Sequence, residues 1–353
     1  MNRKDRIINL LILCASVLLI VGIDRGLLMT INPGAEGIWI PDKNLHFKHR
    51  PLALSKWTAF GNKPIRINSH GHHDDEFPSQ KPRGELRILC LGDSVTMGHG
   101  VTREETYANQ LESILSRSSL DFASYQVINA GVQGYTTFQE LEVLRRSLIF
   151  EPDLITVGFV MNDVTEPLVV DRNFGGTGFD YHEIFQTTSK VANYLLNQTG
   201  FGRFAGKVQY WLIGGPVEAR LQEMYNVEKM VKANWINNDE KIKQSWTVVL
   251  KDLGEIYQVA ESKGIAVTLL IFPYTFQLYD PAMQWPQQLL TTHAQRYGVH
   301  IIDFTKVFED KLAPEHRKVG EYFIDEDHLT VEGHKIVAEV LSLYLQDKFN
   351  AKR

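Results

Sequence analysis

The chain has 353 residues, of which 44% are hydrophobic and 22% are charged, so it can bury one large core or two modest ones. Its formal net charge of −5 excludes the basic field that holds a phosphate backbone, and nucleic acid is not expected as a partner. The two cysteines, Cys14 in an apolar run and Cys90 in an expected strand, provide neither a disulfide framework nor a zinc site.

An apolar segment lies near the N-terminus. Residues Ile7 to Ile23 carry no charge and follow a short basic stretch, and their number is close to the lower limit for a bilayer span. We expect residues 1–29 to be a cytoplasmic N-terminus and an uncleaved, single-pass membrane anchor. Basic residues stay inside, so the remainder is expected on the extracytoplasmic (periplasmic or extracellular) side. A cleaved signal peptide is the main alternative, and a buried core helix is another.

The next part of the chain is irregular and rich in proline. Residues 30–85 are predicted to be a linker and a short, strand-containing lead-in. From Leu86 onward, apolar runs typical of strands alternate with helical periodicity. The expected strands are Arg87 to Leu91, Gln126 to Asn129, Leu154 to Val160, Ile265 to Phe272 and Val299 to Phe304, and the last helix is expected at Val331 to Phe349.

Five strands that alternate with helices indicate an α/β domain over residues 86–349, built on a doubly wound parallel sheet. The stretch at about 165–244 is too long for a plain connection. It is predicted to be an insertion, which is either a lid or substrate-binding element or a structural one.

One serine lies where the first strand of this domain gives way to a helix, in the sequence Gly92-Asp93-Ser94-Val95-Thr96-Met97-Gly98. Open parallel sheets bind ligands beyond the carboxyl ends of their strands, and a helix N-terminus there offers N–H groups to an anion. Ser94 is therefore a candidate nucleophile. The simpler interpretation is that Asp93 and Ser94 only cap the helix.

A loop before the last helix has the sequence Asp325-Glu326-Asp327-His328-Leu329-Thr330. A serine nucleophile needs a base for its proton, and the base needs a carboxylate that holds its tautomer. Asp325 and His328 provide both groups three residues apart. The alternative is a surface turn that caps the last helix through Thr330.

Candidate oxyanion donors follow the other strands. The side-chain amide of Asn162 comes directly after the third strand, and the turn from Asn129 to Gly134 offers backbone N–H groups after the second. Such turns are common, and each signal is weak by itself. Together with the serine and the Asp-His loop, they predict polar groups around a single crevice.

These motifs, in this order, resemble the four marker blocks of the SGNH hydrolase superfamily, the GDSL-type esterases and lipases. Asn68-Ser69-His70-Gly71 also resembles the segment before the catalytic domain in membrane-anchored bacterial members. The resemblance implies a flavodoxin-like SGNH hydrolase fold. It implies these roles: Ser94 as nucleophile and oxyanion-hole amide, Gly134 and Asn162 as further oxyanion-hole donors, His328 as base and Asp325 as its partner. Two features depart from the family pattern: Val160 stands where the third block has glycine, and the insertion is long.

The expected function is that of a serine esterase that hydrolyses an O-acetyl or other acyl ester of a small molecule, glycan or lipid. An O-acyltransferase that uses the same triad on a cell-envelope glycan is the first alternative. A non-catalytic glycan-binding or scaffolding protein is the second. No cofactor and no metal are expected. His70, His72 and His73 are expected to face solvent, and His334 is expected to be structural.

Overall fold

The computed structural model describes residues 12, 15–26, 38–55, 63–164, 201, 227–232, 239–313 and 318–350. The chain divides into two compact units. The first comprises Met1–Glu36 and Phe179–Gln222, and the second comprises Gly37–Gly178 and Glu223–Arg353. The predicted insertion at 165–244 lies mainly outside the described residues.

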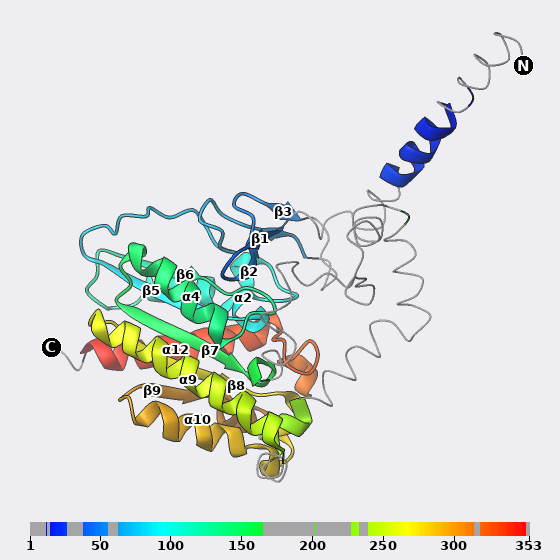
Figure 1. The fold of residues 1–353 in the computed structure, drawn as a ribbon. Coiled ribbons are helices and arrows are strands. Elements are labelled where there is room, and N and C mark those ends of the chain that lie inside the picture. The colour runs from blue at the N-terminus through cyan, green and yellow to red at the C-terminus, as the bar shows by residue number, and fades with distance from the viewer. Residues whose placement is uncertain are drawn as a thin grey trace, which may run out of the picture. The chain divides into compact units, whose positions relative to one another are not determined.

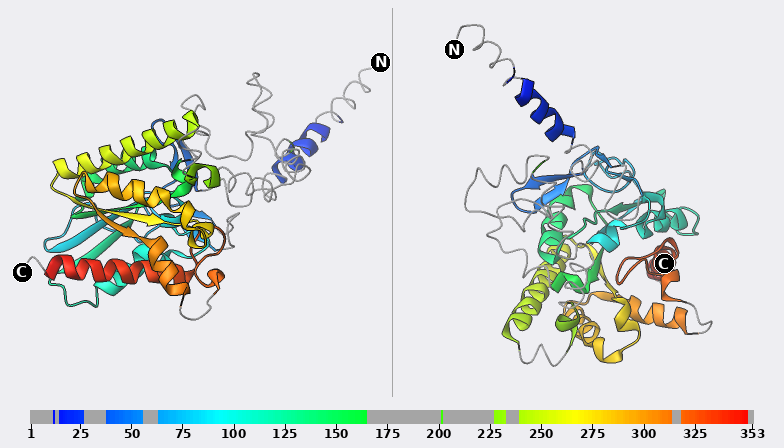
Figure 2. Two further views of the ribbon diagram at one scale, coloured as in Figure 1. Left: turned by 90° about the horizontal axis from the view of Figure 1, so that it is seen from below. Right: turned by 90° about the vertical axis from the view of Figure 1, so that its right-hand side faces the viewer.

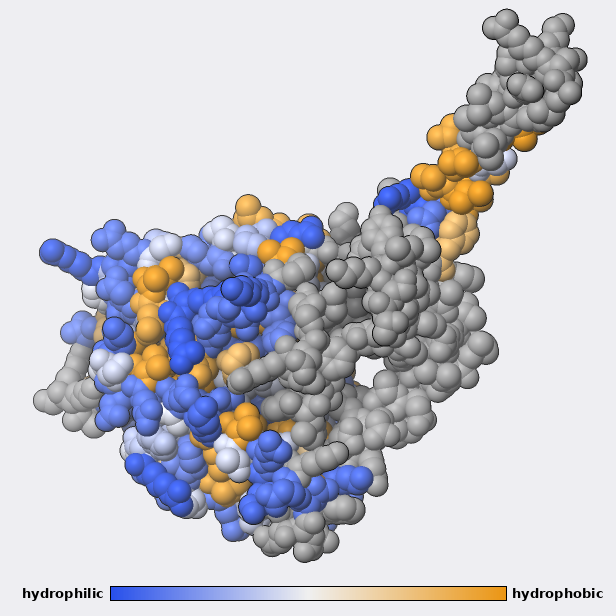
Figure 3. Space-filling view, viewed as in Figure 1, coloured by the Kyte–Doolittle hydropathy of each residue, from blue (hydrophilic) through white to orange (hydrophobic). Residues whose placement is uncertain are grey.

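In the first unit, residues 15–26 form a helix with exposed apolar side chains (Figure 3). Within this unit, the backbone N–H of Phe201 donates to the carboxylate of Asp24 over 3.0 Å. No helix among the described parts of the chain is both long and apolar enough to cross a membrane. Much of the segment from Ile7 to Ile23 lies outside those parts, so the anchor stays a prediction.

The second unit is built on a five-stranded sheet in the order β6-β5-β7-β8-β9, in which all neighbours are parallel. Its strands are β5 (Glu85–Gly92), β6 (Ser124–Asn129), β7 (Leu154–Val160), β8 (Ala266–Phe272) and β9 (His300–Asp303). Every residue of β5 and β7 is buried, which explains their unbroken apolar pattern. The predicted α/β class and parallel sheet are confirmed.

Helices cover both faces of this sheet (Figures 1 and 2). One face is covered by α4 (Thr137–Ser147), α9 (Glu240–Ser262) and α10 (Trp285–Gln295), and the other by α3 (Tyr107–Leu115) and α12 (Val331–Asn350). The chain runs from β5 outward to β6 and then returns to β7 on the other side of β5. The carboxyl ends of β5 and β7 therefore meet at the switch point, where sheets of this kind bind ligands.

Shorter elements complete the unit. They are α2 (Ser94–Met97), α11 (Phe304–Leu312), η2 (Arg103–Glu105), η3 (Leu148–Phe150), η4 (Met161–Val164), η7 (Thr275–Leu278), η8 (Pro281–Met283) and η9 (Val319–Glu321). The fifth strand was predicted to reach Phe304, but it ends at Asp303. The Asp303 carboxylate accepts a hydrogen bond from the Thr305 N–H over 2.9 Å and so starts α11 there.

The lead-in forms two antiparallel pairs, β1 (Trp39–Asp42) with β2 (His46–His49), and β3 (Leu54–Ser55) with β4 (Ile65–Arg66). Its apolar side chains Leu45, Phe47 and Phe77 belong to the same hydrophobic core as the sheet. The Tyr135 hydroxyl, from the turn before α4, donates to the Phe47 carbonyl over 2.6 Å. The lead-in is therefore packed onto the domain.

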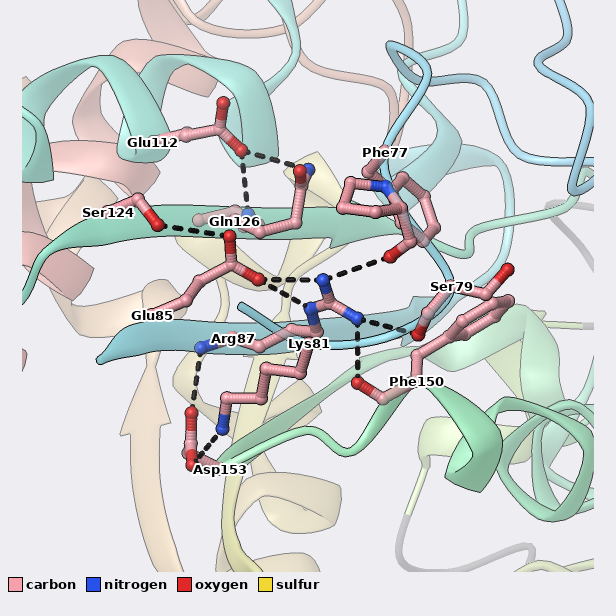
Figure 4. Close-up of polar contacts among 12 residues, drawn as sticks. Phe77, Ser79, Lys81, Glu85, Arg87, Glu112, Ser124, Gln126, Phe150 and Asp153 are labelled. Carbon is pink, nitrogen blue, oxygen red and sulfur yellow. Dashed lines mark hydrogen bonds and ion pairs between the residues drawn. The ribbon is translucent and has the colours of Figure 1, made fainter. Parts of the chain in front are cut away.

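Arg87 fastens the lead-in to the start of β5 (Figure 4). Its fully buried guanidinium contacts the Glu85 carboxylate over 2.7 Å and donates to the carbonyls of Phe150, Ser79 and Pro78 over 2.9–3.2 Å. A buried cation needs such complete pairing, because each lost contact leaves charge in an apolar surrounding. The amino end of β5 is thereby fixed, and its carboxyl end carries Ser94.

Candidate active site

Ser94 begins α2 directly after β5. The carboxylate of Asp93 accepts a hydrogen bond from the Val95 N–H over 2.9 Å, as expected of a residue that orients this turn. Gly92 has φ +154°, and a Cβ there would lie 2.1 Å from the Thr96 hydroxyl oxygen. Only glycine fits this tight exit from the strand, which leaves the Ser94 hydroxyl at the end of the sheet.

The structure brings His328 and Asp325 to this serine. Nε2 of His328 lies 2.9 Å from Oγ of Ser94, and Nδ1 of His328 lies 2.8 Å from a carboxylate oxygen of Asp325. The other Asp325 oxygen accepts the backbone N–H of His328 over 2.9 Å and that of Asp327 over 3.2 Å. These several donors fix the Asp325 carboxylate in place, as the partner of a general base must be.

Contacts at both ends hold the Asp-His loop in position. Phe323 and Leu329 form an antiparallel bridge across it, and the Thr275 N–H donates to the Glu326 carbonyl over 2.7 Å. Thr330 also starts the last helix, since its hydroxyl accepts the Gly333 N–H over 3.1 Å. The capping interpretation is therefore correct for Thr330, while Asp325 and His328 point to Ser94.

A second acid lies next to the same imidazole. Asp327 is 1% exposed, and its carboxylate is 3.4 Å from Nδ1 of His328. Burial, and then the charge of Asp327, raise the pKa of Asp93, while the hydrogen bond from the Val95 N–H opposes the shift. Three acidic side chains, Asp93, Asp325 and Asp327, thus lie around the pair of Ser94 and His328.

The structure places the predicted oxyanion donors at the same edge of the sheet. Asn162 lies in η4 directly after β7, and its Nδ2 donates to Asp93 over 3.2 Å. Gly134, with φ +74°, lies in the turn between β6 and α4. That turn is tied to the serine's strand because the Val132 N–H donates to the Gly92 carbonyl over 3.1 Å.

The residue that departs from the family pattern serves a structural purpose. The Val160 N–H donates to the Asp163 carboxylate over 3.1 Å, so Asp163 stabilises the start of η4. The Val160 side chain is fully buried. A valine at this position is therefore compatible with the placement of Asn162 beside Asp93.

Sequence reasoning missed two residues of this region. His99 stacks on His328, with ring centroids 3.8 Å apart and 22° between the planes. A nitrogen of each ring and an oxygen of Asp325 lie close enough to hold a metal ion. Glu140 in α4 is buried close to Asp93, and burial followed by the Asp93 charge raises its pKa well above the ordinary value. No sequence signal separates either residue from its helical or loop neighbours.

The expectation that His70, His72 and His73 face solvent is wrong for two of them. His72 and His73 are buried, because Asn68 folds the segment back by accepting the His72 N–H over 2.9 Å. The His72 ring packs against Phe77. His334 is structural as expected, since its buried ring accepts the Tyr107 N–H over 3.2 Å.

Comparison with known proteins places the chain in a family. A model of the GDSL-like Lipase/Acylhydrolase family matches residues 90–336. No curated protein matches the chain significantly. Among solved structures, a lipolytic protein of the G-D-S-L family from Desulfitobacterium hafniense DCB-2 is 15% identical, with 73% of this chain and 98% of that chain covered and a TM-score of 0.41.

Two further solved structures are similar at the same level. The lipase/acylhydrolase from Enterococcus faecalis is 15% identical, with 74% of this chain and 96% of that chain covered and a TM-score of 0.43. A catalytic mutant of Axe2, an acetylxylan esterase from Geobacillus stearothermophilus, is 14% identical, with 72% and 92% covered and a TM-score of 0.43.

Proposed function

The chain belongs to the GDSL-like Lipase/Acylhydrolase family and is a carboxylic ester hydrolase, and from this premise we propose that Ser94, His328 and Asp325 are its catalytic triad. The observation that carries the proposal is the line of contacts from Ser94 Oγ to His328 Nε2, at 2.9 Å, and from Nδ1 to Asp325, at 2.8 Å. A nucleophile, a base and an orienting carboxylate are joined in the order that acyl transfer requires.

In the proposed mechanism, Ser94 Oγ attacks the acyl carbon while His328 Nε2 takes the hydroxyl proton. Asp325 holds the Nδ1–H tautomer and stabilises the imidazolium. His328 then gives the proton to the leaving alcohol, and water releases the acyl group from Ser94 by the same steps. No cofactor takes part.

We assign the oxyanion hole to the N–H groups of Ser94 and Gly134 and to the Asn162 amide. Their positions after β5, β6 and β7 support the assignment, because the carboxyl ends of parallel strands share one edge. An amide nitrogen carries two hydrogens, so the contact from Asn162 to Asp93 is compatible with donation to an oxyanion. Such donors stabilise charge only as it develops.

The preferred substrates are proposed to be esters with a short acyl chain, such as acetyl. A hollow of about 10 Å³ lies beside His99, whose ring stacks on that of His328, and it has room for about one water-sized group. It is lined by Lys63, Ile65, Met97, Gly98, His99, Gly100, Val101 and Gln133. A methyl group is of this size, whereas a long acyl chain would have to leave the hollow.

We propose that the hydrolase domain, residues 86–349, lies outside a membrane. Residues 1–29 form the cytoplasmic end and the anchor, and residues 30–85 form the lead-in. The helix at residues 15–26 supports an anchor because its apolar side chains are exposed: Val17, Leu18, Leu19, Ile20, Val21 and Ile23. Basic residues precede them. Ester-bearing glycans or lipids of the cell envelope would then be the accessible substrates.

The decisive experiment compares the full chain with its Ser94→Ala variant on activated esters of increasing acyl length. We expect hydrolysis that is fastest with acetyl and that vanishes in the variant, while the thermal unfolding temperature stays the same. Activity that persists in Ser94→Ala would refute the triad. Transfer of the acyl group to an added sugar without release into water would replace the esterase proposal with the acyltransferase alternative.

A further inference from the structure

One histidine outside the proposed triad is built into its surroundings. The His99 ring lies parallel to the His328 ring at 3.8 Å. The glycine on either side of His99 has positive φ, +91° and +82°, which glycine adopts without strain. A Cβ on Gly100 would lie 2.6 Å from the Ile324 side chain, so the two loops pack closely. The backbone therefore holds His99 against the loop that carries His328.

The three side chains here form a donor set. A nitrogen of His99, a nitrogen of His328 and a carboxylate oxygen of Asp325 lie within 4.8 Å of one another. Two imidazoles and a carboxylate are the ligands that Zn²⁺ and its neighbours in the first transition row take, with remaining positions left to water. His99 and Asp325 are half-exposed, so an ion can reach them from solvent.

The charges around the donor set favour a cation. Asp325 and Asp327 lie 2.8 Å and 3.4 Å from Nδ1 of His328, and Asp93 lies on the other side of Ser94. A cluster of carboxylates in a partly buried site makes the local electrostatic potential negative, which attracts a dication and repels an anion.

We propose that His99, Asp325 and His328 form an inhibitory site for a borderline transition-metal dication such as Zn²⁺. Inhibition rests on the proposed function, whereas binding does not. Tetrahedral coordination at about 2.1 Å brings the donors to about 3.4 Å from one another. The nitrogen lone pairs of two stacked rings point in parallel directions and cannot both point at one ion. The His99 ring must therefore rotate out of the stack before it can bind the ion.

Either nitrogen of His328 yields the same consequence. If Nε2 binds the ion, its lone pair no longer accepts the Ser94 proton. If Nδ1 binds, the single N–H hydrogen of the neutral ring moves through solvent from Nδ1 to Nε2, which then donates instead of accepting. In both cases the base is lost without any change of oxidation state, and removal of the ion restores it.

Binding is tested on the full chain with Ser94→Ala, which retains all three ligands. Zn²⁺ is titrated by calorimetry in a non-chelating buffer, and Co²⁺ is used as an absorption probe of nitrogen coordination. In the same background, His99→Phe keeps a ring against His328 but removes the nitrogen. We expect its Zn²⁺ affinity to fall at least about tenfold. Equal affinity in both proteins would overturn the site.

A matched control exists at the edge of the sheet. His300 stacks on Tyr344 with ring centroids 4.2 Å apart and 6° between the planes. His300→Phe is the same substitution in the same kind of contact away from the site, and we expect it to leave the affinity unchanged. If His99→Phe lowers the thermal unfolding temperature, Asp325→Asn decides instead: weaker binding supports the site, and equal binding overturns it.

Activity provides the second measurement. We expect Zn²⁺ to inhibit ester hydrolysis by the wild type, a chelator to reverse the inhibition, and Mg²⁺, which prefers oxygen ligands, to have no effect. If the enzyme stays fully active at a Zn²⁺ concentration that saturates the site in the calorimetric titration, the proposal that the bound ion inhibits the enzyme is wrong. If the wild type hydrolyses no ester, the proposed function fails by itself, and the calorimetric comparison still decides the metal site.

Discussion

Nδ2 of Asn162 lies 3.2 Å from a carboxylate oxygen of Asp93, so the residue before the proposed nucleophile holds the side chain that follows β7. The same carboxylate group accepts the Val95 N–H over 2.9 Å and thereby starts α2. One buried acid thus fixes both the serine's turn and the proposed oxyanion donor. This link across the switch point makes the geometry of Asn162 dependent on Asp93.

Replacement of Asn162 by alanine tests the donor. We expect Asn162→Ala to lower kcat by about 10²- to 10³-fold with little change in KM, because a donor aimed at the developing oxyanion acts mainly in the transition state. Steady-state kinetics on a short-chain activated ester measures both constants. A loss of less than about threefold, in a protein that unfolds at the wild-type temperature, would remove Asn162 from the oxyanion hole.

Two acids compete for the role of His328's partner. Asp325 lies 2.8 Å and Asp327 3.4 Å from Nδ1, and Asp327 is the more deeply buried. We expect Asp325→Asn to lower kcat by about 10³- to 10⁴-fold, since an amide in that position favours the wrong tautomer of the imidazole. Asp327→Asn should cost about tenfold or less.

Kinetics of the two variants on the same ester distinguishes the acids. The reverse order, with Asp327→Asn the more damaging, would assign the triad acid to Asp327. Both substitutions replace a carboxylate with an amide of the same shape. Differences in packing between the two variants are therefore small.

The short helix α2, which begins at Ser94, is packed against a glycine in the turn after β6. A Cβ on Gly131 would lie 2.3 Å from the Met97 backbone nitrogen and 2.8 Å from the Thr96 carbonyl carbon. Because backbone cannot yield as a flexible side chain does, Gly131→Ala should cost about 1–3 kcal/mol in the free energy of unfolding and lower kcat as Ser94 shifts. Urea unfolding and steady-state kinetics measure the two effects.

A glycine with open space around it is the matched control. Gly320 has no atom within 4 Å of an added Cβ, so Gly320→Ala should change the free energy of unfolding by less than about 0.5 kcal/mol. Equal effects of the two substitutions would contradict the close approach at Gly131.

The central strands β5, β7 and β8 were predictable because each is an almost unbroken run of buried, mostly apolar residues. β7 was predicted with its observed bounds, and β5 and β6 to within two residues at each end. The positions of Ser94, Asn162 and the Asp-His loop follow from the same pattern, since strand ends determine where side chains meet. The local chemistry of hydroxyl, imidazole and carboxylate is also readable without a structure.

Contacts that depend on tertiary packing were not predictable. The stack of His99 on His328 joins residues far apart in sequence, and His99 by itself resembles a surface histidine. Glu140 is buried although glutamate in the first turn of a helix is ordinarily exposed. His72 and His73 are buried because their segment folds back onto the domain. The Asn68 side chain holds this fold by accepting hydrogen bonds from the backbone N–H groups of His70 and His72.

The buried histidine His72 gives the stability a dependence on pH. Burial, and then the charge of His70, lower the pKa of His72 to about 4 in the folded protein, whereas the unfolded chain has about 6.5. Between these values only the unfolded state binds the proton, so His72 lowers the free energy of unfolding by about 1.4 kcal/mol for each unit of falling pH. Above about pH 6.5 it has no such effect.

Urea unfolding of the wild type and His72→Phe at pH 7.5 and pH 5 measures this term. As the pH falls from 7.5 to 5, we expect the free energy of unfolding of the wild type to decrease by about 2 kcal/mol relative to that of the variant. A difference that stays constant with pH would mean that His72 is protonated in the folded state, against its burial beside Phe77.

Asp74, two residues along, should behave in the opposite way. Burial raises its pKa to about 8, while the hydrogen bond from the Asn129 N–H opposes the shift. The folded state then keeps a proton that the unfolded chain loses above about pH 4, so stability falls as pH rises toward 8. Relative to Asp74→Asn, the wild type should therefore be less stable at pH 7.5 than at pH 5. His72 and Asp74 lie in one segment, so the two free energies of unfolding, each relative to its variant, can be compared directly. If both change with pH in the same direction, the cause is a general effect of the lead-in. Only changes in opposite directions agree with burial of both groups.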